Sequence, residues 1–368
     1  MKYEMDFIGI QEETQDADAI CFRYYDETLE RYVVCVYDGG LQAYGTALKN
    51  HLNEYYFNDL NDEEQPKIDY VICSHPHQDH VSGLAEILEA FDVGVLIMNR
   101  PWLYAKDVFD HVKDERITEK SLEKRLRKKY GPIEKLEAIA QAKGIPIQSG
   151  FQGDPIENTM TILSPSKEEF LNLVVRSEKT DFLYETQAKF SESEESTDMV
   201  PADWGKDLLR EDVKTSEENE MSIVLFGDME EESFLLTGDA GIQALGAAIE
   251  YAENTVGSLQ NVKFYQIPHH GGRHNVSPSI LNELVGPIVE EGTTPNKTAY
   301  VSVSVGSDHP RKVVTNAYTQ RGVKVYETKG QTMWHHRGDT PDRGWSAAKK
   351  LPFYAEVEAL SCETGQIR

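Results

Sequence analysis

The sequence contains few cysteines and no pattern that would pair them. Its 368 residues include four cysteines, at positions 21, 35, 73 and 362, with no close pair and no metal-type spacing. This argues against a disulfide framework and against a cysteine-based metal site. Cys21, Cys35 and Cys73 lie in strand-like segments, where cysteine behaves as a small buried hydrophobe. We therefore expect free thiols in a reducing compartment.

Long apolar segments are also absent. No run of residues approaches the roughly 18 apolar positions of a membrane-spanning helix. The N-terminus lacks the basic-then-apolar layout of a secretion signal. These absences argue against a membrane channel, and we expect a soluble, cytoplasmic protein without a membrane partner. The sequence does not predict any protein partner.

Positive charge is scarce, with 37 Lys and Arg against 63 Asp and Glu and a net charge of −26. Because Lys and Arg supply most non-specific affinity for phosphates, this argues against a broad nucleic-acid-binding surface. Residues 191–220 hold eleven acidic and three basic side chains, and we expect an acidic, flexible insertion over residues 187–220. Without residues 191–220, whose net charge is −8, the chain still carries −18. Substrate approach must therefore depend on local positive charge.

A dense cluster of metal-ligand residue types is present instead. Residues 74–83 follow the apolar, strand-like run 68–73 and read Ser-His-Pro-His-Gln-Asp-His-Val-Ser-Gly. They place four ligand-type side chains within six positions: His75, His77, Asp79 and His80. Imidazole nitrogen and carboxylate oxygen are ligands that Zn²⁺ and Mn²⁺ accept. The alternative is a polar, solvated turn, but three histidines this close favour a metal site.

The spacing of these residues suits two ions. Residues two apart in an extended segment point to the same side, so His75 and His77 can bind one ion. The chain then turns toward a helix near Ser82, which displaces Asp79 and His80 toward a second ion. Such a centre needs further ligands from later in the chain, above all a carboxylate that bridges the two ions.

A bridging candidate follows a later strand-like segment. Residues 234–237 have a buried-strand pattern that ends in Gly-Asp at Asp239. A carboxylate at the C-terminal end of a strand faces the crevice where α/β sheets hold their ligands. The alternative role for Asp239 is N-cap of a helix over residues 241–253.

Two more strand ends carry histidines. Residues 262–267 are followed by His269 and His270, and residues 299–305 are followed by Gly-Ser-Asp-His-Pro, which contains His309. Three strand ends thus bring ligand-type residues to one edge of the predicted sheet structure.

In this order the motifs resemble the metallo-β-lactamase fold, and specifically its ComEC-like branch. The resemblance rests on His-Pro-His-Gln-Asp-His, Leu-Leu-Thr-Gly-Asp-Ala, Pro-His-His-Gly-Gly and Asp-His-Pro. Residues 5–10, the Asp-Gly-Gly turn at 38–40 and residues 219–222 also match. The resemblance covers roughly residues 3–98 and 158–330. It implies an α/β protein with an αββα sandwich fold, which we expect to form one domain over residues 1–368 with a helical insertion at 99–157.

The resemblance also implies the metal ligands. One ion is bound by His75 and His77. The other is bound by Asp79, His80 and His269, with His270 as the alternative to His269. Asp239 lies between the two ions. His309 matches a histidine that the family places beside the substrate's phosphate or leaving group. Many members carry a further histidine where this chain has Ser164, a poor metal ligand. The first ion is then three-coordinate from the protein, weakly occupied or completed from elsewhere, so one or two divalent ions, Zn or Mn, are firmly bound.

Such ions would make a hydrolase. A bound divalent cation lowers the pKa of water from about 15.7 toward about 7, and a pair of ions about 3.5 to 4 Å apart can clamp the attacking and leaving oxygens. Asp79 would orient the metal-activated hydroxide, and His309 would donate a hydrogen bond or proton to the leaving oxygen. The resemblance implies a phosphodiesterase or nuclease that acts on a nucleic acid or nucleotide. The alternatives are a hydrolase of a small non-nucleic phosphoester, thioester or lactone, and a non-catalytic binding scaffold, because the fold does not choose among them.

A local basic patch is predicted within residues 117–130. Lys124, Arg125 and Lys128 fall on the polar side of a helix whose apolar side carries Leu122 and Leu126. These cations could contact substrate phosphates. The alternative is a solvated helix face that neighbouring glutamates balance. A histidine pair at 335–336 lies on adjacent residues of a strand-like segment, which face opposite ways and cannot easily join one site.

Overall fold

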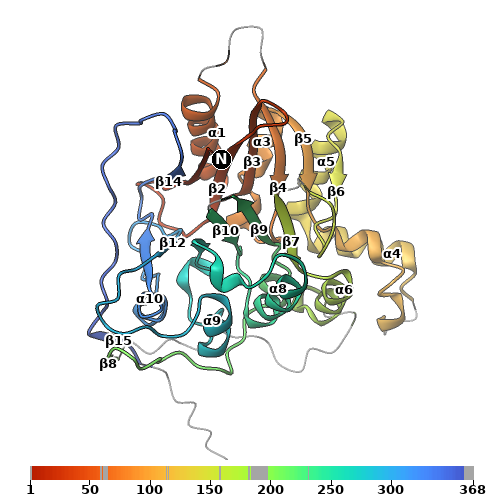
Figure 1. Cartoon of the computed structure of the whole chain (residues 1–368). Coiled ribbons are helices and arrows are strands. Elements are labelled where there is room, and N and C mark those ends of the chain that lie inside the picture. Colours follow the sequence, from red (N-terminus) through yellow and green to blue (C-terminus); the bar gives the residue numbers. More distant parts are fainter. Residues whose placement is uncertain are drawn as a thin grey trace, which may run out of the picture.

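The chain folds into two β-sheets packed face to face between layers of helices (Figure 1). The computed structural model describes residues 2–58, 60, 65–112, 114, 116–156, 159–180, 183, 198–230 and 232–359. The arrangement confirms the αββα sandwich that the sequence predicts.

The first sheet contains strands from both ends of the chain. Its order is β14 (Met333–Arg337), β1 (Tyr3–Phe7), β2 (Ala19–Asp26), β3 (Arg31–Gly39), β4 (Lys67–Ile72), β5 (Asp92–Ile97) and β6 (Ile147–Gln148). The strands from β14 to β3 pair antiparallel, and those from β3 to β6 pair parallel.

The second sheet comes from the C-terminal half. Its order is β13 (Val323–Glu327), β12 (Lys297–Val301), β11 (Phe264–Gln266), β10 (Glu232–Leu236), β9 (Val224–Met229) and β7 (Met160–Ser164). The strands from β10 to β13 are parallel, and β7, β9 and β10 pair antiparallel. A separate ribbon pairs β8 (Met199–Pro201) with β15 (Glu356–Glu358).

Helices cover the outer face of each sheet. The first sheet shares a core with α1 (Gln42–His51), α3 (Leu84–Ala90), α4 (Glu119–Lys129), α5 (Gly131–Lys143) and α6 (Lys167–Arg176). The second sheet shares a core with α8 (Ile242–Thr255), α9 (Pro278–Leu284) and α10 (Lys312–Thr319). Two short helices, α2 (Gln78–Val81) and α7 (Glu217–Glu220), lie in the connections.

Strand β3 shows why the sheets pack on both faces. Its residues Val34 and Val36 join the helix-side core, whereas Val33, Cys35 and Tyr37 join the core between the sheets. Successive side chains of a strand point to opposite faces, so a run of apolar residues fills both layers. The continuous apolar pattern therefore places β3 in the middle of the sandwich.

Both predicted insertions are partly described. Residues 99–157, expected to be a helical insertion, contribute β6 to the first sheet and α4 and α5 to its helical layer. Residues 187–197 of the expected acidic insertion lie outside the described residues. In its remainder, 198–220, β8 pairs with β15 and the Trp204 indole donates a hydrogen bond to the Val289 carbonyl at 2.8 Å, while many side chains stay exposed.

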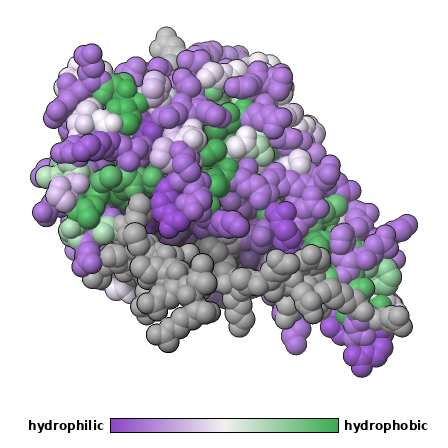
Figure 2. Space-filling view, turned by 90° about the horizontal axis from the view of Figure 1, so that it is seen from below, coloured by the Kyte–Doolittle hydropathy of each residue, from purple (hydrophilic) through white to green (hydrophobic). Residues whose placement is uncertain are grey.

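The face of the molecule in Figure 2 is mostly hydrophilic and carries small, separate apolar patches. Within the described residues, no helix has the length and apolar character needed to cross a bilayer. Cys21, Cys35 and Cys73 are buried free thiols, as predicted, and Cys362 lies outside the described residues.

Candidate metal centre

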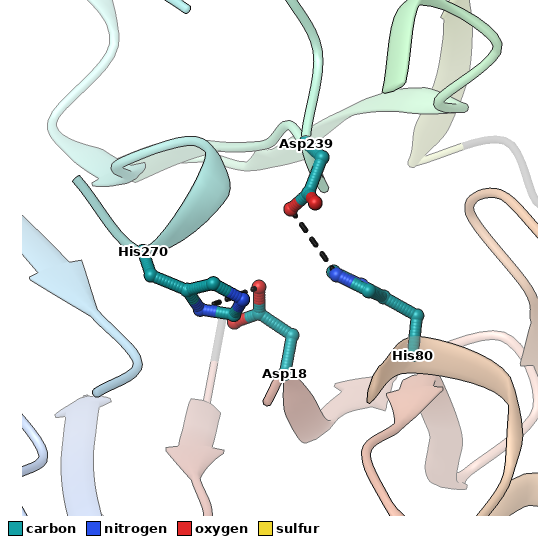
Figure 3. Close-up of side chains that lie close together, drawn as sticks. All are labelled: Asp18, His80, Asp239 and His270. Atoms are coloured by element: carbon teal, nitrogen blue, oxygen red, sulfur yellow. Dashed lines mark ion pairs between the residues drawn. The ribbon is translucent and has the colours of Figure 1, made fainter. Parts of the chain in front are cut away.

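Most of the side chains singled out in the sequence meet where parallel strands of both sheets end. Donor atoms form two groups, each within 4.8 Å: His75, His77 and Asp239, and Asp18, His80, Asp239 and His270. Asp18 was not predicted from the sequence, and Asp79 and His269 belong to neither group. Asp18 and His80 come from the N-terminal half of the chain, and Asp239 and His270 come from loops of the second sheet (Figure 3). The centre therefore exists only because the two halves of the sandwich face each other.

Asp239 lies between the two groups. Its Oδ2 is 3.5 Å from His75 Nε2 and its Oδ1 is 3.1 Å from His80 Nε2, and the side chain is fully buried. Neither carboxylate oxygen has hydrogen-bond geometry with any described residue. Although burial alone would raise it, the neighbouring histidines, His80 first, hold the pKa of Asp239 well below its usual value. Asp239 therefore presents an ionised oxygen to each group.

The loop before α8 holds Asp239 in place through its backbone. The Ser222 hydroxyl accepts from the Asp239 amide at 3.1 Å, and Asn275 Nδ2 donates to the Asp239 carbonyl at 2.7 Å. Glu220 accepts from the Ala244 amide at 2.8 Å at the start of α8. These contacts leave the Asp239 carboxylate unused, and Asp239 does not cap α8, whose N-cap residue is Gly241.

Asp38 fixes the orientation of His80. Its Oδ2 lies 2.8 Å from His80 Nδ1, and its Oδ1 accepts from the Ser74 amide at 2.7 Å. A carboxylate on Nδ1 directs Nε2 toward the metal position and sets the tautomer. Asp38 has a φ of 58° at the end of β3, where Gly39 and Gly40 allow the turn. The Asp-Gly-Gly motif was visible in the sequence, but its role was not.

The two adjacent histidines after β11 point to different places. His270 Nδ1 donates to the Ser302 carbonyl at 2.9 Å, and its Nε2 lies 3.4 Å from Asp79 Oδ2. His269 Nδ1 lies 2.8 Å from Asn275 Oδ1, and its Nε2 lies 3.7 Å from Asp239 Oδ2, on the His75 side. The alternative, His270, thus joins the second group in place of His269, and His269 faces the first group. Both residues adopt positive φ angles, 48° and 54°, which separates their side chains.

Asp79 and His309 lie at the edges of the cluster. Asp79 Oδ2 is 3.7 Å from His80 Nε2, and its side chain is 31% exposed, which leaves it open to an incoming molecule. His309 Nδ1 lies 3.0 Å from Asp16 Oδ2. The His309 loop contacts the His270 turn, because the Arg311 amide donates to the Gly271 carbonyl at 3.1 Å.

The remaining predicted site residues lie apart. Ser164 is buried at the end of β7 and belongs to neither group. Lys124, Arg125 and Lys128 are exposed on α4, whose apolar residues pack inward, and none joins the cluster. His335 pairs with Glu232 at 3.2 Å, and His336 stacks on Trp334, so both histidines of the 335–336 pair have structural contacts elsewhere.

The residues fit divalent cations. Asp18, His80 and Asp239 present buried oxygen and nitrogen atoms that make no hydrogen bond to described residues. Burying such atoms, and carboxylates above all, is costly unless a cation or a proton compensates them. Asp6, Cys21 and His51 form a third group of possible ligands, but this group needs no cation. Arg343 pairs with Asp6 at 2.7 Å, and the Tyr56 hydroxyl donates to Asp6 at 2.8 Å.

Comparison with known proteins agrees with this geometry. Residues 35–146 match the family model of the Metallo-beta-lactamase superfamily. No curated protein matches the chain. A solved N-acyl homoserine lactone hydrolase, with N-hexanoyl-L-homoserine bound at its catalytic metal centre, is 12% identical, with 65% of this chain and 75% of that chain covered and a TM-score of 0.27. A likeness this distant carries no information on substrate. Residues 35–146 are therefore similar to the metallo-β-lactamase superfamily, and the two-sheet sandwich is consistent with its αββα fold.

Proposed function

We propose that the protein is a metal-dependent hydrolase that cleaves a phosphodiester in a small nucleotide or a short nucleic acid strand. The observation that carries the metal dependence is the buried, ionised Asp239 carboxylate, whose two unsatisfied oxygens face two sets of histidines. The observation that favours an anionic substrate is Lys179, beside the same centre.

The residues of the centre would have three roles: binding the ions, orienting the attacking water and assisting the leaving group. The ions would be held by His75, His77, Asp79, His80, His269, His270 and Asp239. When bound, they would acidify a water molecule and polarise the substrate. Asp79, partly exposed, is placed to accept a hydrogen bond from an attacking water. Asp16 orients His309 through Nδ1 and leaves its Nε2 for the leaving oxygen.

Lys179 supplies positive charge at this centre. Burial lowers the pKa of Lys179 against the opposing charges of Glu218 and Asp79, and burial and the Lys179 charge together lower the pKa of His77. The ammonium therefore lies within electrostatic range of His77 and Asp79, and it lies 5.5 Å from the centre of the Tyr130 ring. A cation beside the metal ligands suits a phosphate group.

A substrate panel tests the reaction class. Metal-free protein reloaded with Zn²⁺ or Mn²⁺ would be assayed on bis(p-nitrophenyl) phosphate, cyclic nucleotides, single- and double-stranded DNA, RNA, a thioester and a lactone. We expect turnover of the small phosphodiesters and slower cleavage of duplex DNA, because a net charge of −26 opposes long polyanions. Preference for long single strands would instead support a contact through the α4 cations. Turnover of the thioester or lactone, with no phosphodiester cleaved, would overturn the proposal.

Removing the Lys179 charge should weaken substrate binding more than it slows chemistry. We expect Lys179→Gln to raise KM for a phosphodiester about tenfold, which corresponds to about 1.4 kcal/mol, a typical value for a hydrogen bond to a charged group. We expect kcat to change little, because Lys179 is not a metal ligand. Lys206→Gln, which removes an exposed cation paired with Asp203 at 2.8 Å, is the matched control. An unchanged KM in Lys179→Gln would exclude the phosphate contact.

A further inference from the structure

The two sides of Asp239 differ in their donor atoms. Oδ2 faces His75 at 3.5 Å and His269 at 3.7 Å, and His77 Nδ1 lies 3.1 Å from His75 Nε2. The Ser74 hydroxyl lies 3.0 Å from His75 Nδ1, which leaves Nε2 directed at the group. This side therefore offers three imidazole nitrogens and one carboxylate oxygen.

The Oδ1 side is richer in oxygen. His80 and His270 contribute imidazoles there, and Asp79 Oδ2 lies 3.4 Å from His270 Nε2 and 3.7 Å from His80 Nε2. Asp18 adds another carboxylate and is grouped with His80, Asp239 and His270 (Figure 3). This side offers three carboxylates and two imidazoles.

Asp18 is buried with only one long ion pair. Its side chain is 1% exposed, and neither of its oxygens has hydrogen-bond geometry with a described residue. Its contact with His270 Nδ1 is long, at 3.8 Å, and the hydrogen of that nitrogen is directed to the Ser302 carbonyl at 2.9 Å. A buried carboxylate in this position requires a cation or a proton.

We propose that Asp18 is a direct metal ligand and that the centre is asymmetric, with a nitrogen-rich half selecting Zn²⁺ and an oxygen-rich half selecting Mn²⁺. Imidazole ligands suit Zn²⁺, whereas carboxylate oxygens and water suit the harder Mn²⁺. In this assignment His269 completes the half that Ser164 leaves incomplete, and Asp18 gives the other half its third carboxylate. The inference rests on the proposed metal dependence but not on the identity of the substrate.

Metal content measured without substrate tests the assignment. Metal-free, full-length protein would be dialysed against free Mn²⁺ in large excess over free Zn²⁺, because Zn²⁺ binds most nitrogen and oxygen sites more tightly than Mn²⁺. The protein would then be analysed for both elements, with bound Mn²⁺ followed by electron paramagnetic resonance. We expect one Zn²⁺ and one Mn²⁺ per chain. Two Zn²⁺ per chain under these conditions would overturn the asymmetry. Because no substrate is present, failure of the phosphodiesterase proposal would leave this result unchanged.

Two substitutions distinguish the halves. We expect Asp18→Asn to weaken Mn²⁺ binding by more than about 100-fold and to leave Zn²⁺ binding intact. Substitution of a residue that only positions a ligand typically weakens binding about 10- to 100-fold. His269→Ala should lose Zn²⁺ and retain Mn²⁺. Asp228→Asn is the matched control, because it makes the same change at an exposed carboxylate on β9. A smaller Mn²⁺ effect in Asp18→Asn would make Asp18 a positioning residue for His270.

Stability provides a second readout of the Asp18 role. Without metal, Asp18→Asn should be at least as stable as the parent protein, since the substitution removes a buried charge whose ion pair with His270 is long, at 3.8 Å. With Mn²⁺ present, the parent protein should gain stability and the variant should not. Thermal unfolding of both proteins with and without Mn²⁺ measures this. Equal stabilisation of the variant by Mn²⁺ would exclude Asp18 as a ligand.

Discussion

Asp239→Asn is expected to lower kcat/KM for a phosphodiester by at least about 10³-fold, which corresponds to about 4 kcal/mol of transition-state stabilisation. Asp239 is the residue whose two oxygens face both halves of the centre, at 3.1 Å from His80 and 3.5 Å from His75. The amide offers one oxygen and places an NH₂ group toward the other half, so one ion should be lost. Steady-state kinetics and elemental analysis of the same preparation measure both effects.

The fold should survive the Asp239→Asn substitution. The backbone contacts of Asp239 with Ser222 and Asn275 do not involve its carboxylate, so the unfolding temperature of the metal-free variant should stay close to that of the parent. Asp228→Asn, an exposed carboxylate on β9 of the same sheet, should leave both activity and metal content unchanged. Full activity with two ions bound in Asp239→Asn would remove this residue from the bridging role.

Gly83→Ala is expected to lower the free energy of unfolding by about 3 to 5 kcal/mol, among the largest effects for a one-carbon change. A Cβ at Gly83 would lie 1.9 Å from the Gly39 carbonyl oxygen and 2.7 Å from the Gly45 amide nitrogen. These are backbone atoms of two other elements, so no side chain can move aside to relieve the contact. The measurement is urea-induced unfolding of the metal-free protein.

The same contact couples Gly83 to the metal centre. Gly39 follows Asp38, and Gly83 lies three residues after His80, so the separation forced by a methyl group should lengthen the Asp38–His80 contact of 2.8 Å. Metal affinity should therefore fall together with stability. Gly246→Ala in α8 is the matched control, because its nearest neighbour would be Ile280 Cδ1 at 3.7 Å and alanine favours a helix by up to about 1 kcal/mol. A Gly83→Ala protein as stable as the control would contradict the steric argument.

Much of the architecture was predictable because it depends on local patterns. The apolar run of residues 68–73 followed by His75 and His77 predicted a strand ending in ligands, and β4 ends at Ile72 directly before them. The same reasoning placed Asp239 after β10 and His269 after β11. The order of the motifs was sufficient for the fold class. The boundaries of the insertions were not predictable, because the packing of Trp102 and Leu122 on the main core depends on surfaces from distant parts of the chain.

The roles of Asp18 and Asp38 could not be obtained from spacing. Asp38 lies 42 residues before His80, and the distance between them is set by the glycine contact between two loops. Asp18 precedes β2, and only sheet packing brings it under His270 of the opposite half. The order of His269 and His270 depended on two consecutive left-handed residues, a conformation that no side-chain pattern announces.

By itself the sequence determined which residue types would end the strands. The sandwich fold and most of the residues that meet at its edge follow from that, because they depend on periodicity and on short motifs. Only the tertiary structure decided which atom of each side chain faces which neighbour. Asp239 divides its oxygens between two histidine sets, His269 and His270 separate, and Asp18 is buried beside them with only a long ion pair, to His270. The reason is physical. The side chains of the centre come from two sheets, and the direction of each is set by backbone turns and close contacts between segments far apart in the chain.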